Sequence, residues 1–213
     1  MNVRSSRMPE QQPRKWKDLG VRIITALIGA GVLIGAALNG RLWGWAIVFS
    51  IISGLAAAEF YAMMQHERSR PNEVFGVIAA AAMPLAAAAR GTAGLTGALT
   101  VLVVASLIWH LAFRSASTRD LAVTVFGSVY VGFTLAHMVL MRSLSAGVEL
   151  TLLTLISVWL SDIAAYFVGS AVGRHRLAPK ISPNKSWEGF FAGLAATVGI
   201  WVGAYFLVDT GLP

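Results

Sequence analysis

Residues 148–169 read VELTLLTLISVWLSDIAAYFVG, an almost unbroken run of apolar side chains. A bilayer core about 30 Å thick is crossed by roughly 20 apolar residues in an α-helix. The run lacks the strict alternation of apolar and polar residues that is typical of a membrane β-strand. The stretch therefore predicts a transmembrane helix, and the same pattern recurs on both sides of it.

Six further stretches have a similar character, at residues 21–38, 42–64, 74–89, 94–113, 121–141 and 190–208. Of the 213 residues, 56% are hydrophobic and only 13% are charged, whereas an ordinary soluble domain is about a quarter charged. This composition excludes soluble globular and disordered proteins. The chain has no Cys, which excludes disulfides and a Cys nucleophile. The predicted fold class is an all-α polytopic membrane protein with about seven transmembrane helices.

The basic residues predict how these helices are oriented. Fourteen of the 17 Lys and Arg residues lie before or at the start of the first segment, or in the second, fourth and sixth connections. Only Arg41, Arg90 and Arg142 lie on the other side. Because cytoplasmic loops carry an excess of Lys and Arg, we predict a cytoplasmic N-terminus and a location in the inner or plasma membrane. The net charge of +7 then indicates anionic lipid or a phosphate-bearing substrate, and no nucleic acid.

The predicted organisation is a polar basic tail at residues 1–18 followed by one transmembrane domain at 19–213. The sixth connection, at residues 170–189, is expected to be a cytoplasmic loop that binds substrate.

Two carboxylates fall well inside predicted helices, where an ionisable group costs at least about 2.5 kcal/mol. Glu59 lies about one turn from a cytoplasmic helix end, so either it reaches the headgroups or a basic neighbour, or it belongs to a site. Asp162 shares a helix face with Ala165, Tyr166 and Gly169, by i+3 and i+4 spacing. The side chains on that face are mostly small or polar, so we expect the face to line the bundle interior or a water-filled cleft. Asp162 is then a candidate metal ligand or proton carrier, or else makes a structural hydrogen bond.

The sixth connection contains GRHRLAPKISPNKSWEG, residues 173–189. Ser182 followed by Pro183 is typical of a helix start, which would place the backbone N–H groups of residues 184–186 beside Lys180 and Lys185. Such a helix N-terminus favours anions, so this loop predicts a phosphate site. Arg174 and Arg176 either join it or are ordinary cytoplasmic charges. Glu188 either pairs with a cation of the loop or helps to hold a metal.

Four glycine pairs at i, i+4 spacing predict close helix packing. They are Gly31/Gly35, Gly169/Gly173, Gly189/Gly193 and Gly199/Gly203. His110 and His137 lie on different predicted helices, neither with a second His at ligand spacing, so we expect both to be satisfied or interfacial histidines.

The stretch from Ser161 to Gly189 resembles the bacterial phosphatidate cytidylyltransferases. The residues that carry the resemblance are Asp162, Ala165-Tyr166, Gly169, Gly173-Arg174, Leu177-Ala178-Pro179, Ile181-Ser182-Pro183, Lys185-Ser186 and Trp187-Glu188-Gly189. Ile163 departs from the family's usual small or hydroxyl residue, and Ser170 from a common basic one.

The resemblance implies transfer of a cytidylyl group from CTP to phosphatidate, giving CDP-diacylglycerol and pyrophosphate, with Mg²⁺ or another divalent cation. It implies Asp162 and Lys185 as catalytic residues and Asp162 and Glu188 as metal ligands. The expected substrate-binding residues are Tyr166, Arg174, Lys180, Ser182, Asn184 and Ser186.

A second family signature, with Lys-Asp, His-Gly-Gly and two aspartates around an Arg, does not occur in this sequence. We therefore expect the chain to resemble the N-terminal part of such an enzyme, to have little activity alone, and to act as a homodimer or with a C-terminal half. The alternatives are a transporter or channel that uses Asp162 and Glu59, and a non-catalytic membrane fragment.

Overall fold

The computed structural model describes residues 15–39, 41–66, 71–112 and 117–207. The chain divides into two compact units, residues 1–35 and 36–213. The described part of the first unit is helix α1, Lys15–Leu38, whose last residues belong to the second unit. Residues 15–18, which were predicted to belong to the tail, are thus part of helix α1. Lys and Trp are both compatible with a helix. Residues 1–14 lie outside the described part of the chain.

The second unit contains the other helices and one small sheet. In chain order these are α2 Leu42–His66, α3 Glu73–Ala112, α4 Thr118–Ser128, the π-helix η1 Val129–Phe133, α5 Thr134–Arg142, α6 Gly147–Val172, strands β1 Arg176–Ala178 and β2 Ser182–Ser186, and α7 Trp187–Leu207. Each of the seven predicted apolar segments is helical over its described residues. The segment 121–141 is continuous through α4, η1 and α5.

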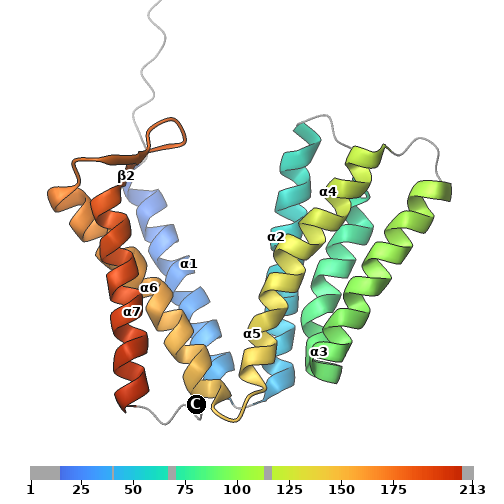
Figure 1. The fold of residues 1–213 in the computed structure, drawn as a ribbon, viewed down its shortest axis with the longest axis horizontal. Helices are drawn as coiled ribbons and strands as arrows, with labels where there is room; N and C mark the ends of the chain where they lie inside the picture. Colours follow the sequence, from blue (N-terminus) through green and yellow to red (C-terminus); the bar gives the residue numbers. More distant parts are fainter. Residues whose placement is uncertain (1–14, 40, 67–70, 113–116, 208–213) are drawn as a thin grey trace, which may run out of the picture. The chain divides into compact units, whose positions relative to one another are not determined.

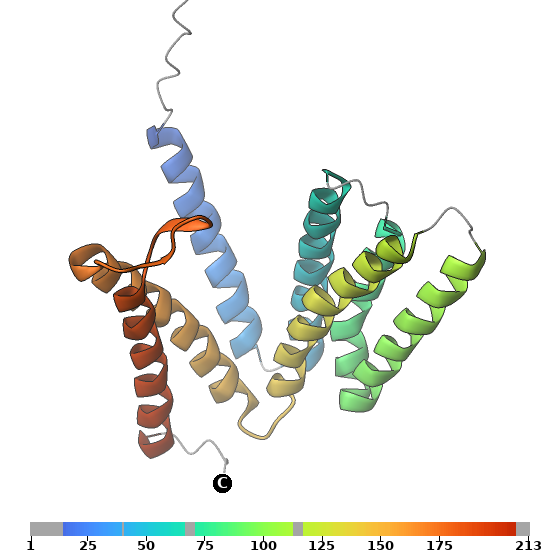
Figure 2. The same ribbon diagram turned by 45° about the horizontal axis from the view of Figure 1, so that its top comes forward.

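Helix α3 consists of two arms joined at Arg90 and Gly91. Gly91 has φ of 60° and ψ of −141°, a backbone conformation that favours glycine. The arms approach closely beyond the turn, because a Cβ at Gly94 would lie 2.0 Å from the Ala86 carbonyl oxygen. Figures 1 and 2 both show the arms side by side. The two segments predicted at 74–89 and 94–113 are therefore an antiparallel helix pair.

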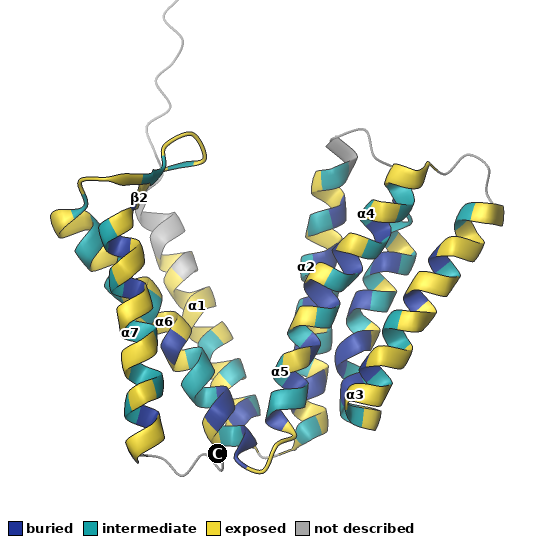
Figure 3. Cartoon of the chain, in the orientation of Figure 1, coloured by how far each residue is buried: buried dark blue, intermediate teal, exposed yellow. Residues whose placement is uncertain are grey.

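Helices α2 to α5 pack around a core centred on Tyr61, together with Ala57, Ala80 and Val131. The Tyr61 hydroxyl donates to the Thr124 carbonyl oxygen at 2.6 Å. Gly76 lets the ring approach, since a Cβ there would lie 2.3 Å from the Tyr61 hydroxyl oxygen. Figure 3 shows buried residues running along these helices. At the opposite helix ends, the Trp45 indole donates to the Met138 carbonyl oxygen at 3.0 Å.

The outer helix surfaces are apolar, as a membrane protein requires. Five helices among the described residues are long and apolar enough to cross a bilayer, and one of these is the two-armed α3. Large apolar side chains such as Leu55, Val74 and Leu111 are 65%, 72% and 79% exposed on them. The predicted fold class, an all-α polytopic membrane protein, is confirmed. The number of crossings and the cytoplasmic N-terminus stay predictions.

Candidate functional site

Helices α6 and α7 pack through glycines and small residues, side by side in Figures 1 and 2. A Cβ at Gly189 would lie 2.6 Å from the Ala165 carbonyl oxygen, and one at Gly193 would lie 2.9 Å from the Ser161 hydroxyl oxygen. Gly169 faces Gly189 across the same contact. The packing predicted for Gly169/Gly173 and Gly189/Gly193 is therefore confirmed.

The other two glycine pairs do not pack in the described part of the chain. A Cβ built at any residue of Gly31/Gly35 or Gly199/Gly203 meets no described atom within 4 Å. Of the four predicted glycine pairs, only the two on α6 and α7 therefore mark a contact among the described residues.

A short antiparallel β-hairpin connects α6 to α7. Arg176 pairs with Ser186 and Ala178 with Ser182, with a bulge between the two pairs. The turn is closed by a hydrogen bond from the Ile181 N–H to the Ala178 carbonyl oxygen at 3.1 Å. Pro179 occupies the second position of this turn, where its fixed φ is favoured.

The predicted helix start at Ser182 and Pro183 is wrong, because these residues belong to strand β2. Helix α7 begins four residues later, at Trp187, and the Gly189 N–H donates to the Ser186 hydroxyl at 3.2 Å. Ser186 is therefore the N-cap. The first N–H groups of the helix belong to residues 187–189 instead of 184–186, and those of Trp187 and Gly189 are already hydrogen-bonded within the chain. An acid in the first turn, Glu188, is the sequence signal that favours the later start.

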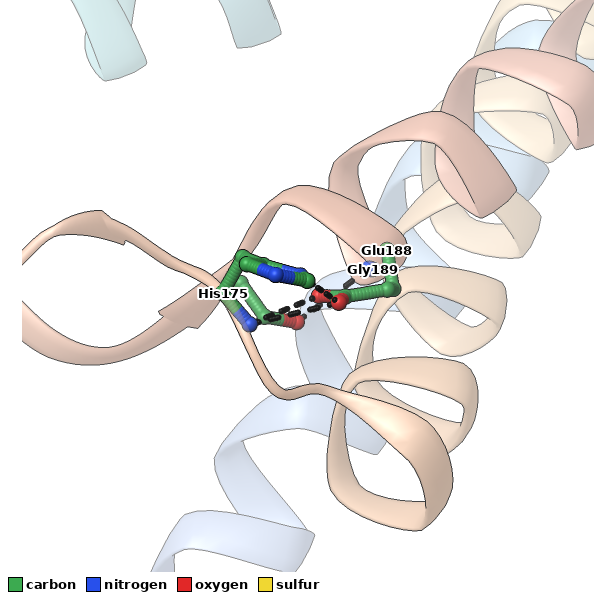
Figure 4. A network of polar contacts seen from close by, with 4 residues as sticks. His175, Glu188 and Gly189 are labelled. Atoms are coloured by element: carbon green, nitrogen blue, oxygen red, sulfur yellow. Dashed lines mark hydrogen bonds and ion pairs between the residues drawn. The ribbon is translucent and has the colours of Figure 1, made fainter.

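The hairpin is held to the start of α7 by His175 and Glu188, as Figure 4 shows. The Glu188 carboxylate lies 2.7 Å from the His175 ring Nδ1 and accepts from the His175 backbone N–H at 3.2 and 3.3 Å. The Trp187 N–H donates to the His175 carbonyl oxygen at 2.9 Å. Glu188 thus pairs with His175 of the loop, and with none of the Lys or Arg side chains among the described residues, while its predicted role as a metal ligand stays a prediction. Sequence reasoning missed the partner, because only the hairpin brings residues 13 positions apart together.

Four cationic side chains, Arg174, Arg176, Lys180 and Lys185, stand exposed on this hairpin. Their side chains have no hydrogen-bond or ion-pair partner in the part of the chain that the structure describes. Because the hairpin is held in place by the contact between His175 and Glu188, its unpaired cations form a positively charged surface that can bind phosphate groups.

The predicted substrate-binding residues of β2 have different surroundings. Asn184 is exposed beside Lys185, and Ser182 is half-buried. Ser186 is 4% exposed, and its hydroxyl lies against Gly169, Gly173 and Gly189. A Cβ at Gly173 would lie 2.6 Å from that hydroxyl oxygen. The Ser186 hydroxyl is thus engaged in capping α7, while its predicted role toward substrate stays a prediction.

Asp162 lies on an exposed face of α6, so the predicted grouping is only partly right. Ala165 and Gly169 face α7, but Asp162 and Tyr166 point away from that contact, and Tyr166 is 71% exposed. The row that packs is Ser161, Ala165 and Gly169, spaced by four residues and displaced by one position from Asp162. The Asp162 carboxylate has no partner among the described residues.

Glu59 is likewise exposed on α2 and has no partner among the described residues. Both roles considered for it remain open.

The carboxylates do not assemble a metal centre in the described ranges. No group of three or more His, Asp or Glu side chains that could hold a metal occurs there. Of the two predicted metal ligands, Glu188 is already bound by His175, which leaves only Asp162 without a described partner. Such a donor set does not fit a cation held by the protein alone. It fits Mg²⁺ that arrives with substrate phosphates, because Mg²⁺ often uses one carboxylate, phosphate oxygens and water.

Comparison with known proteins adds independent information. The model of the cytidylyltransferase family matches residues 20–211. A phosphatidate cytidylyltransferase of Pseudomonas aeruginosa is 33% identical over 187 residues, which cover 82% of this chain and 66% of the relative. Those of Staphylococcus haemolyticus and Staphylococcus aureus are each 36% identical, over 96 and 93 residues, and the match covers 36% and 35% of their lengths. The chain thus spans about two thirds of the first relative and about a third of the other two. On the match over residues 20–211, this chain belongs to the cytidylyltransferase family.

Proposed function

We propose that the chain takes part in transferring a cytidylyl group from CTP to phosphatidate, as a nucleotidyltransferase of phospholipid biosynthesis. Its relatives are named phosphatidate cytidylyltransferases. The observation that carries the proposal is the hairpin with four exposed, unpaired cations, clamped to the start of a membrane helix. Two phosphate-bearing substrates, one soluble and one in the bilayer, meet at such a boundary. We place this hairpin on the cytoplasmic side of the inner or plasma membrane.

In the proposed reaction an oxygen of the phosphatidate phosphate attacks the α-phosphorus of CTP. A new P–O bond forms while the bond between the α-phosphorus and the bridging oxygen breaks, and pyrophosphate leaves. Lys180 and Lys185 bind phosphate oxygens and offset the charge that accumulates on the leaving group. Arg174 adds a bidentate donor, and Asn184 offers a neutral hydrogen-bonding group beside Lys185.

Asp162 is the carboxylate that we propose for a divalent cation carried by the nucleotide. A bound Mg²⁺ would neutralise phosphate charge at the reacting centre. Asp162 needs a partner inside a membrane, and the described chain provides none. In this proposal, the partner of Asp162 approaches the exposed side of α6 that carries Asp162 and Tyr166. That partner is the substrate, a second copy of the chain or a further protein segment.

Replacing Lys185 by Met tests the role of the hairpin in phosphate binding. Equilibrium binding of CTP to the purified chain in lipid nanodiscs is the measurement. We expect affinity to fall about ten- to hundredfold, because a charge-assisted hydrogen bond contributes roughly 1.5–3 kcal/mol. The matched control is Arg119→Met, which removes an exposed cation from the start of α4, on the same predicted side of the membrane. Equal affinities of the two variants would contradict the assignment of the hairpin.

A further inference from the structure

His175 lies in the basic connection but has no part in the reaction as proposed above. Its immediate neighbours are Arg174 and Arg176, two of the four exposed cations of the hairpin. Three polar groups of His175 contact the start of α7. The backbone N–H and the ring Nδ1 both contact the Glu188 carboxylate, and the carbonyl oxygen accepts from the Trp187 N–H at 2.9 Å. Residue 175 therefore ties the beginning of the hairpin to the membrane helix.

The ring contact contributes little to the stability of the fold as a whole. The side chain of His175 is 79% exposed, and that of Glu188 is 25% exposed. Pairs at the surface have small effects on unfolding, because water competes for both groups and both side chains lose conformational freedom. The effect of the ring is therefore local, on the position of the hairpin relative to the start of α7.

The ring nitrogen makes the shortest contact with Glu188. Nδ1 lies 2.7 Å from Oε1, whereas the His175 N–H lies 3.2 and 3.3 Å from the two carboxylate oxygens. A carboxylate only accepts hydrogen bonds, so Nδ1 carries the proton in this contact. Among the described residues, no other side chain of residues 174–185 is hydrogen-bonded to α6 or α7. The Nδ1–H group is thus the side-chain donor that attaches the cationic hairpin.

We propose that His175 is a positioning residue for phosphate binding, which rests on the function proposed above. Its Nδ1–H acts through Glu188 and holds the hairpin on α7 before a ligand arrives. A hairpin that is already ordered loses less conformational entropy on binding, so its affinity for phosphate groups is higher. Without the ring contact, Arg174 and Arg176 keep their charges, but the ligand must order the segment that carries them.

Two amide side chains separate the roles of the two ring nitrogens. The amide nitrogen of Asn is bonded to Cγ, as Nδ1 is, so His175→Asn keeps a donor beside Glu188. The amide nitrogen of Gln extends to the distance of Nε2, so His175→Gln loses that contact but offers a donor to a ligand. His175→Ala removes both donors. The control is His137→Ala, which removes another exposed histidine, one whose Nδ1 lies 2.8 Å from the Phe133 carbonyl oxygen.

Hydrogen exchange of the amides of residues 174–187 tests the order of the hairpin, on the full chain in lipid nanodiscs without ligand. We expect exchange about five- to tenfold faster in His175→Ala and His175→Gln, because a hydrogen bond to a charged group no longer opposes opening. His175→Asn and His137→Ala should exchange like the natural chain. The unfolding temperature should change little in all four variants, since the ring is exposed. Unchanged exchange in His175→Ala would show that the ring does not order the hairpin and would overturn the proposal.

Equilibrium binding of CTP and of inorganic pyrophosphate to the same variants tests the consequence for phosphate groups. His175→Ala and His175→Gln should bind both about tenfold more weakly, and His175→Asn should bind like the natural chain. Tighter binding by His175→Gln than by His175→Asn would overturn the proposal, because it would indicate a direct contact through Nε2. Equal affinities of His175→Asn and His175→Ala would also overturn it. If the natural chain binds neither ligand, the function proposed above fails, while hydrogen exchange still decides whether His175 orders the hairpin.

Discussion

Asp162 carries a formal charge on a helix whose exposed neighbours, such as Trp159 and Ile163, are apolar. The same holds for Glu59 on α2, so the two residues form a natural pair for comparison. If Asp162 binds a nucleotide-borne cation, Asp162→Asn should abolish most of the gain in CTP affinity that Mg²⁺ provides. CTP binding without Mg²⁺ should change little, since the amide keeps the shape of the side chain. Titrations of CTP with and without Mg²⁺ measure both quantities.

Glu59→Gln serves as the matched control, because it neutralises another carboxylate of a predicted transmembrane helix. We expect it to leave the Mg²⁺ effect intact. A Mg²⁺ effect of normal size in well-folded Asp162→Asn would refute the role given to Asp162.

At the level of single residues, the sequence indicated which side chains are charged and exposed, but not which residues they contact. The charges of Lys180 and Lys185 could be assigned to an exposed loop because cations avoid the bilayer core. The contact between His175 and Glu188 could not be predicted, because it depends on a hairpin that folds the chain back. The orientation of Asp162 was also missed, since α6 packs on the neighbouring row of small residues.

Among elements, helices of this chain were predictable and strands were not. The unbroken apolar runs predict the ends of most helices to within a few residues, because a helix must have a minimum apolar length to cross the bilayer. Strands β1 and β2 are three and five residues long and largely polar, so they show no usable periodicity. Ser182 and Ser186 are both possible N-caps. Glu188 in the first turn favours the second, and the pairing of Ser182 with Ala178 in the hairpin excludes the first.

The α6–α7 contact provides a prediction at this scale. Gly189→Ala should destabilise the chain, because its Cβ would lie 2.6 Å from the Ala165 carbonyl oxygen and 3.2 Å from the Gly169 Cα. Overpacking of this kind costs about 1–3 kcal/mol. Thermal unfolding in detergent should therefore show a loss of several degrees. Gly203→Ala, on the same helix with no described atom within 4 Å, should be neutral or slightly stabilising. Equal unfolding temperatures would show that the glycines of α7 are interchangeable.

At the scale of the whole molecule, the helices of the α2–α5 group alternate in direction. The indole of Trp45 near the start of α2 binds the Met138 carbonyl oxygen near the end of α5. At the other end, the Asn72 N–H donates to the Thr124 hydroxyl at 2.9 Å. Connections therefore fall at alternate ends, in keeping with the alternation of basic residues along the sequence. The side of the membrane on which each end lies is a separate prediction, which follows from charge alone.

Labelling of single cysteines tests that orientation without background, because the natural chain has no Cys. Ile181→Cys, 89% exposed at the hairpin turn, and Arg119→Cys, exposed in the first turn of α4, should react with a membrane-impermeant maleimide only in inverted vesicles. Thr92→Cys and Ser145→Cys, both exposed at the opposite helix ends, should react only in right-side-out cells. The expectation rests on the excess of Lys and Arg near residues 119 and 181, compared with residues 92 and 145. Reaction of Ile181→Cys from outside would reverse the orientation, and it would remove CTP from reach of the hairpin, since the nucleotide is synthesised inside the cell.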